Sequence, residues 1–272
     1  MSVAATRTRL DAELVRRKLA RSRGQAAELI ADGHVTVNGM PASKAASMVD
    51  RDTPVVVRAD DEPGWASRGA KKLLGVLDAF TEIEVAGTRC LDAGASTGGF
   101  TDVLLRRGAA EVVAVDVGYG QLDWRLRTDG RVVVHDRTNV RTLDQDTIGE
   151  QVELTVADLS FISLRTVLPA LATCTVPGGT LLPMVKPQFE VGKARLGSGG
   201  VVRDPALRRE ALTDVAAAAD AIGLRVAGAV ASPLPGPSGN VEYFLHLRRD
   251  AGGTDPAARD RMLAAAVEDG PA

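Results

Sequence analysis

The sequence is poor in cysteine and aromatic residues, and it has no long hydrophobic run. Its 272 residues include two cysteines, Cys90 and Cys174, which are too few for a disulfide scaffold and have no nearby partner for a metal site. No apolar run approaches about 18 residues, since Asp220 and Arg225 interrupt the alanine-rich stretch after Leu212. We therefore expect no metal, no membrane span and, without a recognisable signal peptide, a cytoplasmic location.

What is present fits an ordinary globular protein. Hydrophobic residues make up 45% of the chain, enough to fill a sizeable core, and the length suggests one large or two smaller domains. The formal net charge of -2 argues for no particular partner. Residues 1–24 are the exception, because they hold seven basic residues and only two acidic ones, Asp11 and Glu13. This segment is a candidate surface for an anionic partner.

Residues 1–59 predict a small α+β domain that starts with two helices. Leu10 and Leu14 give one apolar face to the first helix. Ser22 and Gln25 match a capping box at the start of the second helix, in which the two residues satisfy each other's free amides. The basic residues are available to the other faces. An RNA-binding module and a helix with solvated arginines explain this pattern equally well.

A small sheet follows the two helices. The dipeptide Asn38-Gly39 is the strongest short signal for a β-hairpin, and residues 55–57 predict a further strand. An acidic, turn-forming segment then marks the domain boundary. We place the linker at residues 60–66.

Residues 67–250 alternate strands with helices and predict a doubly wound α/β sheet. The seven strand-like segments lie near residues 89–92, 112–116, 131–135, 152–157, 180–185, 224–230 and 241–247. The loop between the last two is too short for a crossover helix, so we expect these strands to pair antiparallel. Residues 251–272 are predicted to be a frayed C-terminal tail with one weak helix.

The segment LDAGASTGGF, from Leu91 to Phe100, predicts a cofactor site at a strand-to-helix turn. Gly94 allows the backbone to turn tightly, and Gly98 allows it to approach a ligand closely. Asp116 ends the next apolar run about 20 residues later, where an acidic residue takes the hydroxyls of a ribose. The turn therefore indicates a nucleotide-type cofactor.

Three interpretations of this turn stay open on its residues alone. A dinucleotide fingerprint needs glycine at position 96, where this chain has Ser96, so NAD fits less well. S-adenosylmethionine fits better, because it has a ribose and an adenine but no phosphate. A structural turn without a ligand is the third. The antiparallel final strand pair, which is typical of S-adenosylmethionine methyltransferases, further disfavours NAD.

The expected cofactor-binding residues are Gly94, Ser96, Thr97, Gly98, Asp116, Asn139 and Asp158.

Charged residues also occur where the predicted strands end, at the edge where open α/β sheets bind ligands. Asp158 and Lys186 each follow an apolar run. Taken alone, Asp158 could cap the next segment, and Lys186 could extend to the surface. Glu242 in the last strand and Lys72 at the start of a helix are, singly, ordinary surface residues.

As a set, these patterns resemble known families. The segment RLDAELVRRKLARSRGQAAELIADGHVTVNG is similar to the S4 RNA-binding domain. The motifs SRGAKKL, LDAGASTGGFTDVLL, ADLSFISL, VKPQFEVGK and SPLPGPSGNVEYF resemble those of the TlyA (hemolysin A-type) rRNA methyltransferases, in which an S4 domain precedes an FtsJ-like methyltransferase domain. The resemblance covers nearly the whole chain. It implies a Rossmann-like, seven-stranded class I S-adenosylmethionine-dependent methyltransferase fold after the α+β S4 domain.

The resemblance also implies roles for the charged residues, which match the Lys-Asp-Lys-Glu tetrad of ribose 2′-O-methyltransferases in order and context. Lys186 would activate the ribose 2′-hydroxyl, and Lys72 would orient the ribose and stabilise developing negative charge. Asp158 and Glu242 would position the two lysines. Free lysine has a pKa of about 10.4, so a lysine base needs desolvation or a neighbouring cation, which a second lysine provides. Which lysine takes the proton stays open.

The S4 resemblance implies that basic residues grip structured RNA. The candidate contacts are Arg7, Arg9, Arg16, Arg17, Lys18, Arg21, Arg23 and Arg68. The family implies cytidine in 16S and 23S rRNA as the substrate, within ribosomal subunits, and a link to capreomycin and viomycin susceptibility. We expect a monomer. Two other hypotheses are a non-catalytic ribosome assembly factor, which the intact tetrad disfavours, and a pore-forming hemolysin, which the missing span disfavours.

Overall fold

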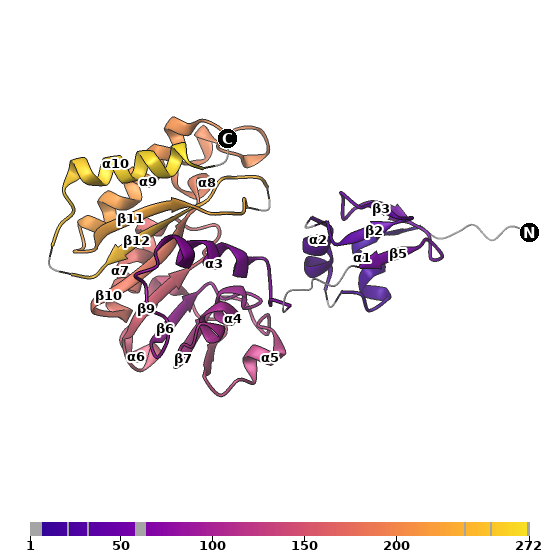
Figure 1. The fold of residues 1–272 in the computed structure, drawn as a ribbon, viewed down its shortest axis with the longest axis horizontal. Coiled ribbons are helices and arrows are strands. Elements are labelled where there is room, and N and C mark those ends of the chain that lie inside the picture. The colour runs from indigo at the N-terminus through magenta and orange to yellow at the C-terminus, as the bar shows by residue number, and fades with distance from the viewer. Residues whose placement is uncertain are drawn as a thin grey trace, which may run out of the picture. The chain divides into compact units, whose positions relative to one another are not determined.

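The structure is a computed structural model that divides the chain into two compact units, Met1–Ser67 and Arg68–Ala272 (Figure 1). Most of the predicted linker lies outside the described residues, as does Arg21. The described residues are 7–20, 22–31, 33–57, 64–236, 238–250 and 252–270.

The N-terminal unit has the two predicted helices followed by a small sheet, and also a short strand before the first helix that the sequence did not predict. Its elements are β1 (Thr8–Arg9), α1 (Leu10–Arg16), α2 (Arg23–Ala31), β2 (Val35–Val37), β3 (Met40–Pro41), β4 (Met48–Val49) and β5 (Val55–Val57). Leu10 and Leu14 are fully buried in the core between these elements. Strand β2 pairs antiparallel with β3 and β5, and β1 pairs with β4.

One local prediction in this unit is confirmed in full, and a second is confirmed in one of its two hydrogen bonds. Asn38 and Gly39 both have positive φ, 51° and 78°, as a tight hairpin turn between β2 and β3 requires. Ser22 Oγ accepts a hydrogen bond of 3.1 Å from the amide of Gln25, which is one half of the predicted capping box.

The second unit alternates strands and helices along the chain. Its elements are α3 (Gly69–Ala79), β6 (Arg89–Ala93), α4 (Gly99–Arg106), β7 (Glu111–Val115), α5 (Trp124–Arg127), β8 (Val132–His135), α6 (Gln145–Ile148), β9 (Val152–Ala157), α7 (Leu164–Cys174), β10 (Thr175–Val185), α8 (Pro187–Glu190), α9 (Pro205–Asp220), β11 (Arg225–Ala231), β12 (Tyr243–Arg248) and α10 (Pro256–Glu268). Short 3-10 helices lie at Val140–Thr142, Lys193–Arg195 and Ser198–Gly200.

These strands form one seven-stranded sheet in the order β11-β12-β10-β9-β6-β7-β8 (Figure 1). Strands β10, β9, β6, β7 and β8 are parallel, and β12 runs antiparallel to both β10 and β11. The predicted seven-stranded sheet and its antiparallel final pair are therefore confirmed. The carboxyl ends of five parallel strands meet at one edge, where Asp158 and Lys186 and the predicted cofactor residues follow them.

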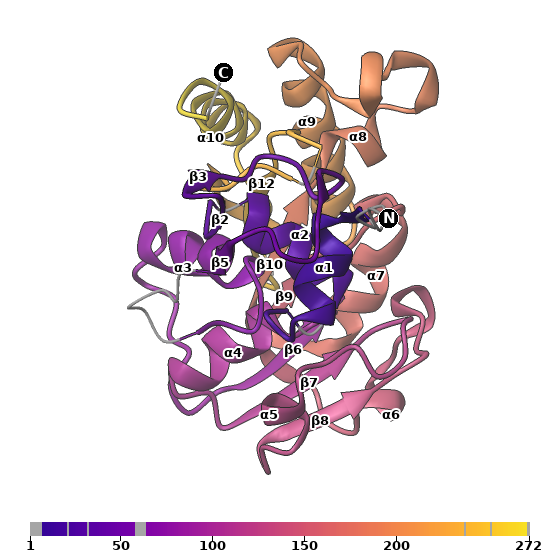
Figure 2. The same ribbon diagram turned by 90° about the vertical axis from the view of Figure 1, so that its right-hand side faces the viewer.

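Alternation of side chains divides the sheet into two faces. Tyr243 and Leu245 of β12 pack into a core cluster with side chains of α7, α9 and α10. Phe244, between them, points to the other face, where its ring lies 6.1 Å from that of Phe100 in α4. Figure 2 shows α3 and α4 on one side of the sheet and α7 on the other. Because side chains alternate with a period of two, Glu242 and Phe244 share the α3 and α4 face.

The helix predicted in the C-terminal tail is present as α10, but it is packed on the sheet and is not frayed. Asp255 caps this helix by accepting a hydrogen bond of 3.0 Å from the Ala258 amide, and Leu263 is fully buried in the core cluster beside the sheet. Thr254, just before the helix, bonds through Oγ1 to both the amide and the carbonyl of Val226 in β11, at 2.7 and 3.2 Å. The apolar stripe of α10 is too narrow for its sequence to reveal this packing.

Candidate active site

The four residues of the predicted tetrad meet at the carboxyl edge of the sheet. Lys72 Nζ lies 2.5 Å from Glu242 Oε2, and Lys186 Nζ lies 2.6 Å from Asp158 Oδ1. Lys186 Nζ also lies 4.0 Å from Glu242 Oε1. The side chains thus form a continuous chain of alternating charge, from Lys72 through Glu242 and Lys186 to Asp158.

The sheet explains why residues far apart in sequence meet here. In the antiparallel ladder of β10 and β12, Val185 pairs with Tyr243. One step beyond this pair, Lys186 and Glu242 lie opposite each other on the face that α3 covers. Lys72 comes from α3, where its Nζ also approaches the sulfur of Met184 at 3.9 Å. Each contact follows from strand register and helix position.

Most of this cluster is buried. Lys72 is 6% exposed, Lys186 7% and Glu242 1%. Buried charges are tolerated only when they are paired, and Glu242 supplies an anion between two cations. The side chain of Asp158 is 24% exposed, so the cluster reaches solvent at its Asp158 end.

Two further residues of the cluster were missed in the sequence analysis. Lys186 Nζ donates a hydrogen bond of 3.1 Å to Ser160 Oγ, which gives the lysine a neutral partner beside Asp158. Gly236 lies against Glu242, since a Cβ at this position would be 2.5 Å from Glu242 Oε1. A serine in a loop and a glycine in a proline-rich segment carry no periodic signal, so no pattern in the sequence could have identified them.

The glycine turn lies directly beside this cluster. The Asp158 amide donates a hydrogen bond of 3.1 Å to the Ala93 carbonyl, at the end of β6. Gly94 has a φ of 89°, and a Cβ there would be 2.5 Å from the Asp158 carbonyl oxygen. Only glycine permits this approach without displacing the backbone. The turn and the catalytic candidates therefore belong to one site.

The turn also includes Asp116, as its position after β7 predicted. The Asp116 carboxylate accepts hydrogen bonds from the amides of Ser96, at 2.9 Å, and Gly118, at 2.7 Å. A half-buried carboxylate beside a turn without side-chain bulk fits a ligand that presents ribose hydroxyls to an acceptor. The residues present thus fit the nucleoside part of S-adenosylmethionine.

The structure brings together six of the seven predicted cofactor residues, at the ends of β6, β7 and β9. These are Gly94, Ser96, Thr97, Gly98, Asp116 and Asp158. Asn139 lies beyond the end of β8, where its Oδ1 accepts a hydrogen bond of 3.0 Å from the Arg141 amide and its side chain is exposed. The geometry therefore gives Asn139 a local capping contact.

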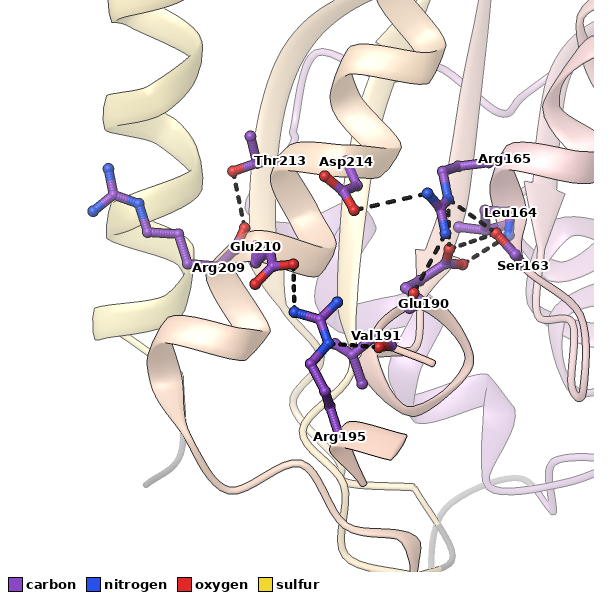
Figure 3. Close-up of polar contacts among 10 residues, drawn as sticks. All are labelled: Ser163, Leu164, Arg165, Glu190, Val191, Arg195, Arg209, Glu210, Thr213 and Asp214. Atoms are coloured by element: carbon purple, nitrogen blue, oxygen red, sulfur yellow. Dashed lines mark hydrogen bonds and ion pairs between the residues drawn. The ribbon is translucent and has the colours of Figure 1, made fainter. Parts of the chain in front are cut away.

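Glu190 connects the loop after β9, which carries Asp158, to the segment after β10, which begins with Lys186. It is 5% exposed at the end of α8, and its carboxylate accepts hydrogen bonds from Ser163 Oγ, at 2.6 Å, and from the Leu164 amide, at 2.7 Å (Figure 3). Arg165 lies between Glu190 and Asp214 of α9, at 3.4 and 3.7 Å. The segment after β10 is thereby fixed to the loop after β9.

Asp92, inside β6, is a buried carboxyl beside the site. It is fully buried, and its Oδ2 accepts a hydrogen bond of 2.7 Å from Thr101 Oγ1. Burial raises the pKa of Asp92 from 3.8 to about 7. The folded state therefore binds this proton more tightly than the unfolded state does.

The raised pKa predicts a pH-dependent stability. The contribution of Asp92 is fully present below pH 3.8 and is lost as the pH rises towards 7. Between about pH 5 and about pH 7, we expect the free energy of unfolding to carry a negative slope of up to ~1.4 kcal/mol per pH unit from this group. Urea denaturation of Asp92→Asn should lack this component, whereas the exposed control Asp146→Asn should keep it. Equal slopes in wild type and Asp92→Asn would contradict the prediction.

The predicted RNA contacts of the N-terminal unit surround two buried acids. Asp11 and Glu13 are 3% and 1% exposed, and each accepts hydrogen bonds from two arginines. The pairs are Arg9 and Arg23 around Asp11, and Arg16 and Arg17 around Glu13. Of the other candidates, Arg7 lies 3.6 Å from Asp50, Lys18 is exposed, and Arg68 directly precedes α3 in the second unit.

Comparison with protein families agrees with this architecture. Residues 65–249 match the FtsJ-like methyltransferase family, and residues 8–55 match the S4 domain. The fold and the site thus define an FtsJ-like methyltransferase that carries an N-terminal S4 domain.

Individual relatives narrow this class. The chain is 60% identical over 263 residues to the 16S/23S rRNA (cytidine-2′-O)-methyltransferase TlyA of Mycobacterium tuberculosis strain H37Rv, with 97% of each chain covered. It is 36% identical to Hemolysin A of Brachyspira hyodysenteriae, covering 88% of this chain and 99% of that protein. A solved Streptococcus thermophilus structure that carries the hemolysin name has a TM-score of 0.76 at 35% identity over 98% of both chains. The chain belongs to the TlyA family.

Some relatives of this chain carry the name hemolysin, which raises the question of a membrane-spanning helix. In the part of the chain that the structure describes, no helix is long and apolar enough to cross a membrane.

Proposed function

We propose that this protein transfers a methyl group from S-adenosylmethionine to the ribose 2′-hydroxyl of a cytidine in 16S rRNA, 23S rRNA or both. The observation that carries the proposal is the buried chain of two lysines and two carboxylates beside the glycine turn. The name of the 60% identical mycobacterial relative supports the cytidine and rRNA parts. The S4 domain supports an RNA substrate.

The charged residues act on the attacking hydroxyl. A ribose hydroxyl is a weak nucleophile, so its proton must leave as the oxygen forms its bond to the methyl carbon. In this proposal Lys186, which Asp158 and Ser160 hold in place, first releases one proton to solvent at the Asp158 end of the cluster, and its neutral Nζ then accepts the hydroxyl proton. Lys72, held by Glu242, orients the ribose and stabilises the negative charge that develops on the oxygen.

The glycine turn holds the methyl donor. When bound, S-adenosylmethionine would supply an electrophilic methyl group on a sulfonium centre, and the donor would leave as the neutral thioether. Asp116 would accept hydrogen bonds from its ribose hydroxyls, and the backbone around Gly94 and Gly98 would hold its methionine and ribose. Ser96 and Thr97 would contribute to the same turn, and Asn139 would contribute on the adenine side.

The substrate side requires a nucleotide that can reach the pocket. We propose that the S4 domain docks on folded rRNA in ribosomal subunits and that the target nucleotide is exposed there, by flipping where it is stacked. The protein acts in this proposal as a cytoplasmic monomer. Loss of the modification would alter susceptibility to capreomycin and viomycin, an extension that rests on the family resemblance.

Methyl transfer to purified ribosomal subunits tests the proposal. The full chain is incubated with tritiated S-adenosylmethionine and with 30S or 50S subunits, and the label is followed into RNA and then into digested nucleosides. We expect label in 2′-O-methylcytidine. RNA binding without any transfer would overturn the proposal in favour of a non-catalytic ribosome assembly factor.

A further inference from the structure

Asp11 is one of only two acids in the basic segment of residues 1–24, and it is buried there. Its side chain is 5% exposed, and its carboxylate binds two arginines from different parts of the chain. Arg9 donates from Nε to Oδ1 at 3.1 Å and from Nη2 to Oδ2 at 2.9 Å. Arg23, at the start of α2, donates from Nη2 to the same Oδ2 at 3.0 Å. One buried acid therefore joins the beginnings of both helices.

The two arginines remain accessible while Asp11 holds them. Their side chains are 46% exposed for Arg9 and 60% exposed for Arg23. Both Nη2 atoms lie within 3.0 Å of one oxygen, so they are no more than about 6 Å apart. A single phosphate group can contact two guanidinium groups at this separation. The pair therefore has the spacing of a phosphate clamp.

The acid itself is held firmly and stays ionised. The amide of Ala12 donates to Asp11 Oδ1 at 2.8 Å, which fixes the carboxylate on the first turn of α1. The hydrogen bonds from Arg9 lower the pKa of Asp11 to about 2, despite the opposing effect of burial. At neutral pH the two arginines are thus bound to a fixed anion.

The neighbouring acid, Glu13, provides an internal comparison. It binds Arg16 and Arg17, but Arg17 also donates from Nη1 to the Thr53 carbonyl at 2.9 Å and from Nη2 to the Arg51 carbonyl at 2.7 Å. The side chain of Arg17 is only 20% exposed. The Arg17 guanidinium connects α1 to the turn before β5. Glu13 therefore holds an arginine whose contacts are mainly within the domain.

We propose that Asp11 is a positioning residue that holds Arg9 and Arg23 as a preformed clamp for one RNA backbone phosphate. The inference rests on the proposed function, because it assumes an RNA substrate. Preorganisation lowers the entropy that the two long side chains lose when they bind. Asp11 therefore strengthens RNA binding although it carries the same charge as RNA.

The sign of one mutational effect tests this proposal. Asp11→Asn keeps the side-chain size but removes the negative charge, so charge alone predicts tighter RNA binding. We expect the full-length variant to bind purified ribosomal subunits roughly three- to thirtyfold more weakly in filter binding, with a salt slope shallower by about 1. Asp52→Asn removes an exposed acid of the same unit and should leave affinity unchanged or slightly raised. If Asp11→Asn binds as tightly as Asp52→Asn does, the proposal is overturned.

A second pair of variants keeps the test valid if Asp11→Asn lowers the stability of the domain. Arg23→Lys preserves charge on an exposed side chain but removes the planar fork. We expect roughly three- to tenfold weaker binding, compared with no change for the exposed control Arg51→Lys. Wild-type affinity in Arg23→Lys would show that a point charge suffices and would overturn the clamp. Failure of the wild-type chain to bind subunits would instead overturn the proposed function.

Discussion

Lys186→Ala is expected to lower kcat for methyl transfer by about 10²- to 10⁴-fold, the range typical for loss of a general base. Its Nζ lies 2.6 Å from Asp158 and 3.1 Å from Ser160, at the end of the cluster that reaches solvent. The glycine turn does not depend on this side chain, so the affinity for S-adenosylmethionine should stay within about threefold of wild type. Single-turnover methylation and calorimetric titration of the cofactor measure the two effects separately.

Controls for this prediction are available in the same region. Lys71 precedes Lys72 on α3 but is exposed, and Lys71→Ala should retain wild-type kcat. Lys72→Ala should also lower kcat, because the negative charge that develops on the oxygen then loses its stabilising cation. If Lys186→Ala retains activity, Lys186 is not the base.

Glu242→Gln is expected to destabilise the methyltransferase unit by about 3 to 5 kcal/mol and to lower methyl transfer as well. Glu242 is 1% exposed and lies 2.5 Å from Lys72 and 4.0 Å from Lys186. Glutamine has nearly the same size, so Gly236 still fits against it. The variant leaves the buried ammonium group of Lys72 without its anion, while Lys186 keeps Asp158 as a partner. Urea denaturation, followed by circular dichroism, measures the change in the free energy of unfolding.

A second substitution separates charge from packing in this result. In Lys72→Met/Glu242→Gln, the cation that Glu242 compensates is also gone, so part of the lost stability should return. Glu84→Gln, an exposed acid of the same unit, should have little effect on unfolding. Equal stability of wild type and Glu242→Gln would mean that the buried cluster is not ionised as the geometry suggests.

The fold was largely predictable because its signals are local. The seven apolar runs, the Asn38-Gly39 turn and the short final connection each act within a few residues, and they specified the sheet and its antiparallel pair. The tetrad was predictable only as a set, through family resemblance. Lys72 and Glu242 are 170 residues apart, and nothing in the sequence around either one indicates the other.

The parts that could not be predicted depend on tertiary contacts. Ser160 acquires its role only because β9 and β10 end side by side, which brings its hydroxyl to Lys186. Asp11 counts in the sequence simply as one negative charge in a basic segment. Its importance emerges when two arginines that are 14 positions apart bind one of its oxygens. The packing of α10 depends on a single stripe that the alanines around it obscure.

The Thr254 contact has a consequence for solubility. Strand β11 is an edge strand of the sheet. An unpaired edge strand is a template on which other chains can assemble into aggregates. Thr254 Oγ1 bonds to the amide and the carbonyl of Val226, two backbone groups of this strand. The segment before α10 thus occupies part of the edge that an intermolecular strand would use.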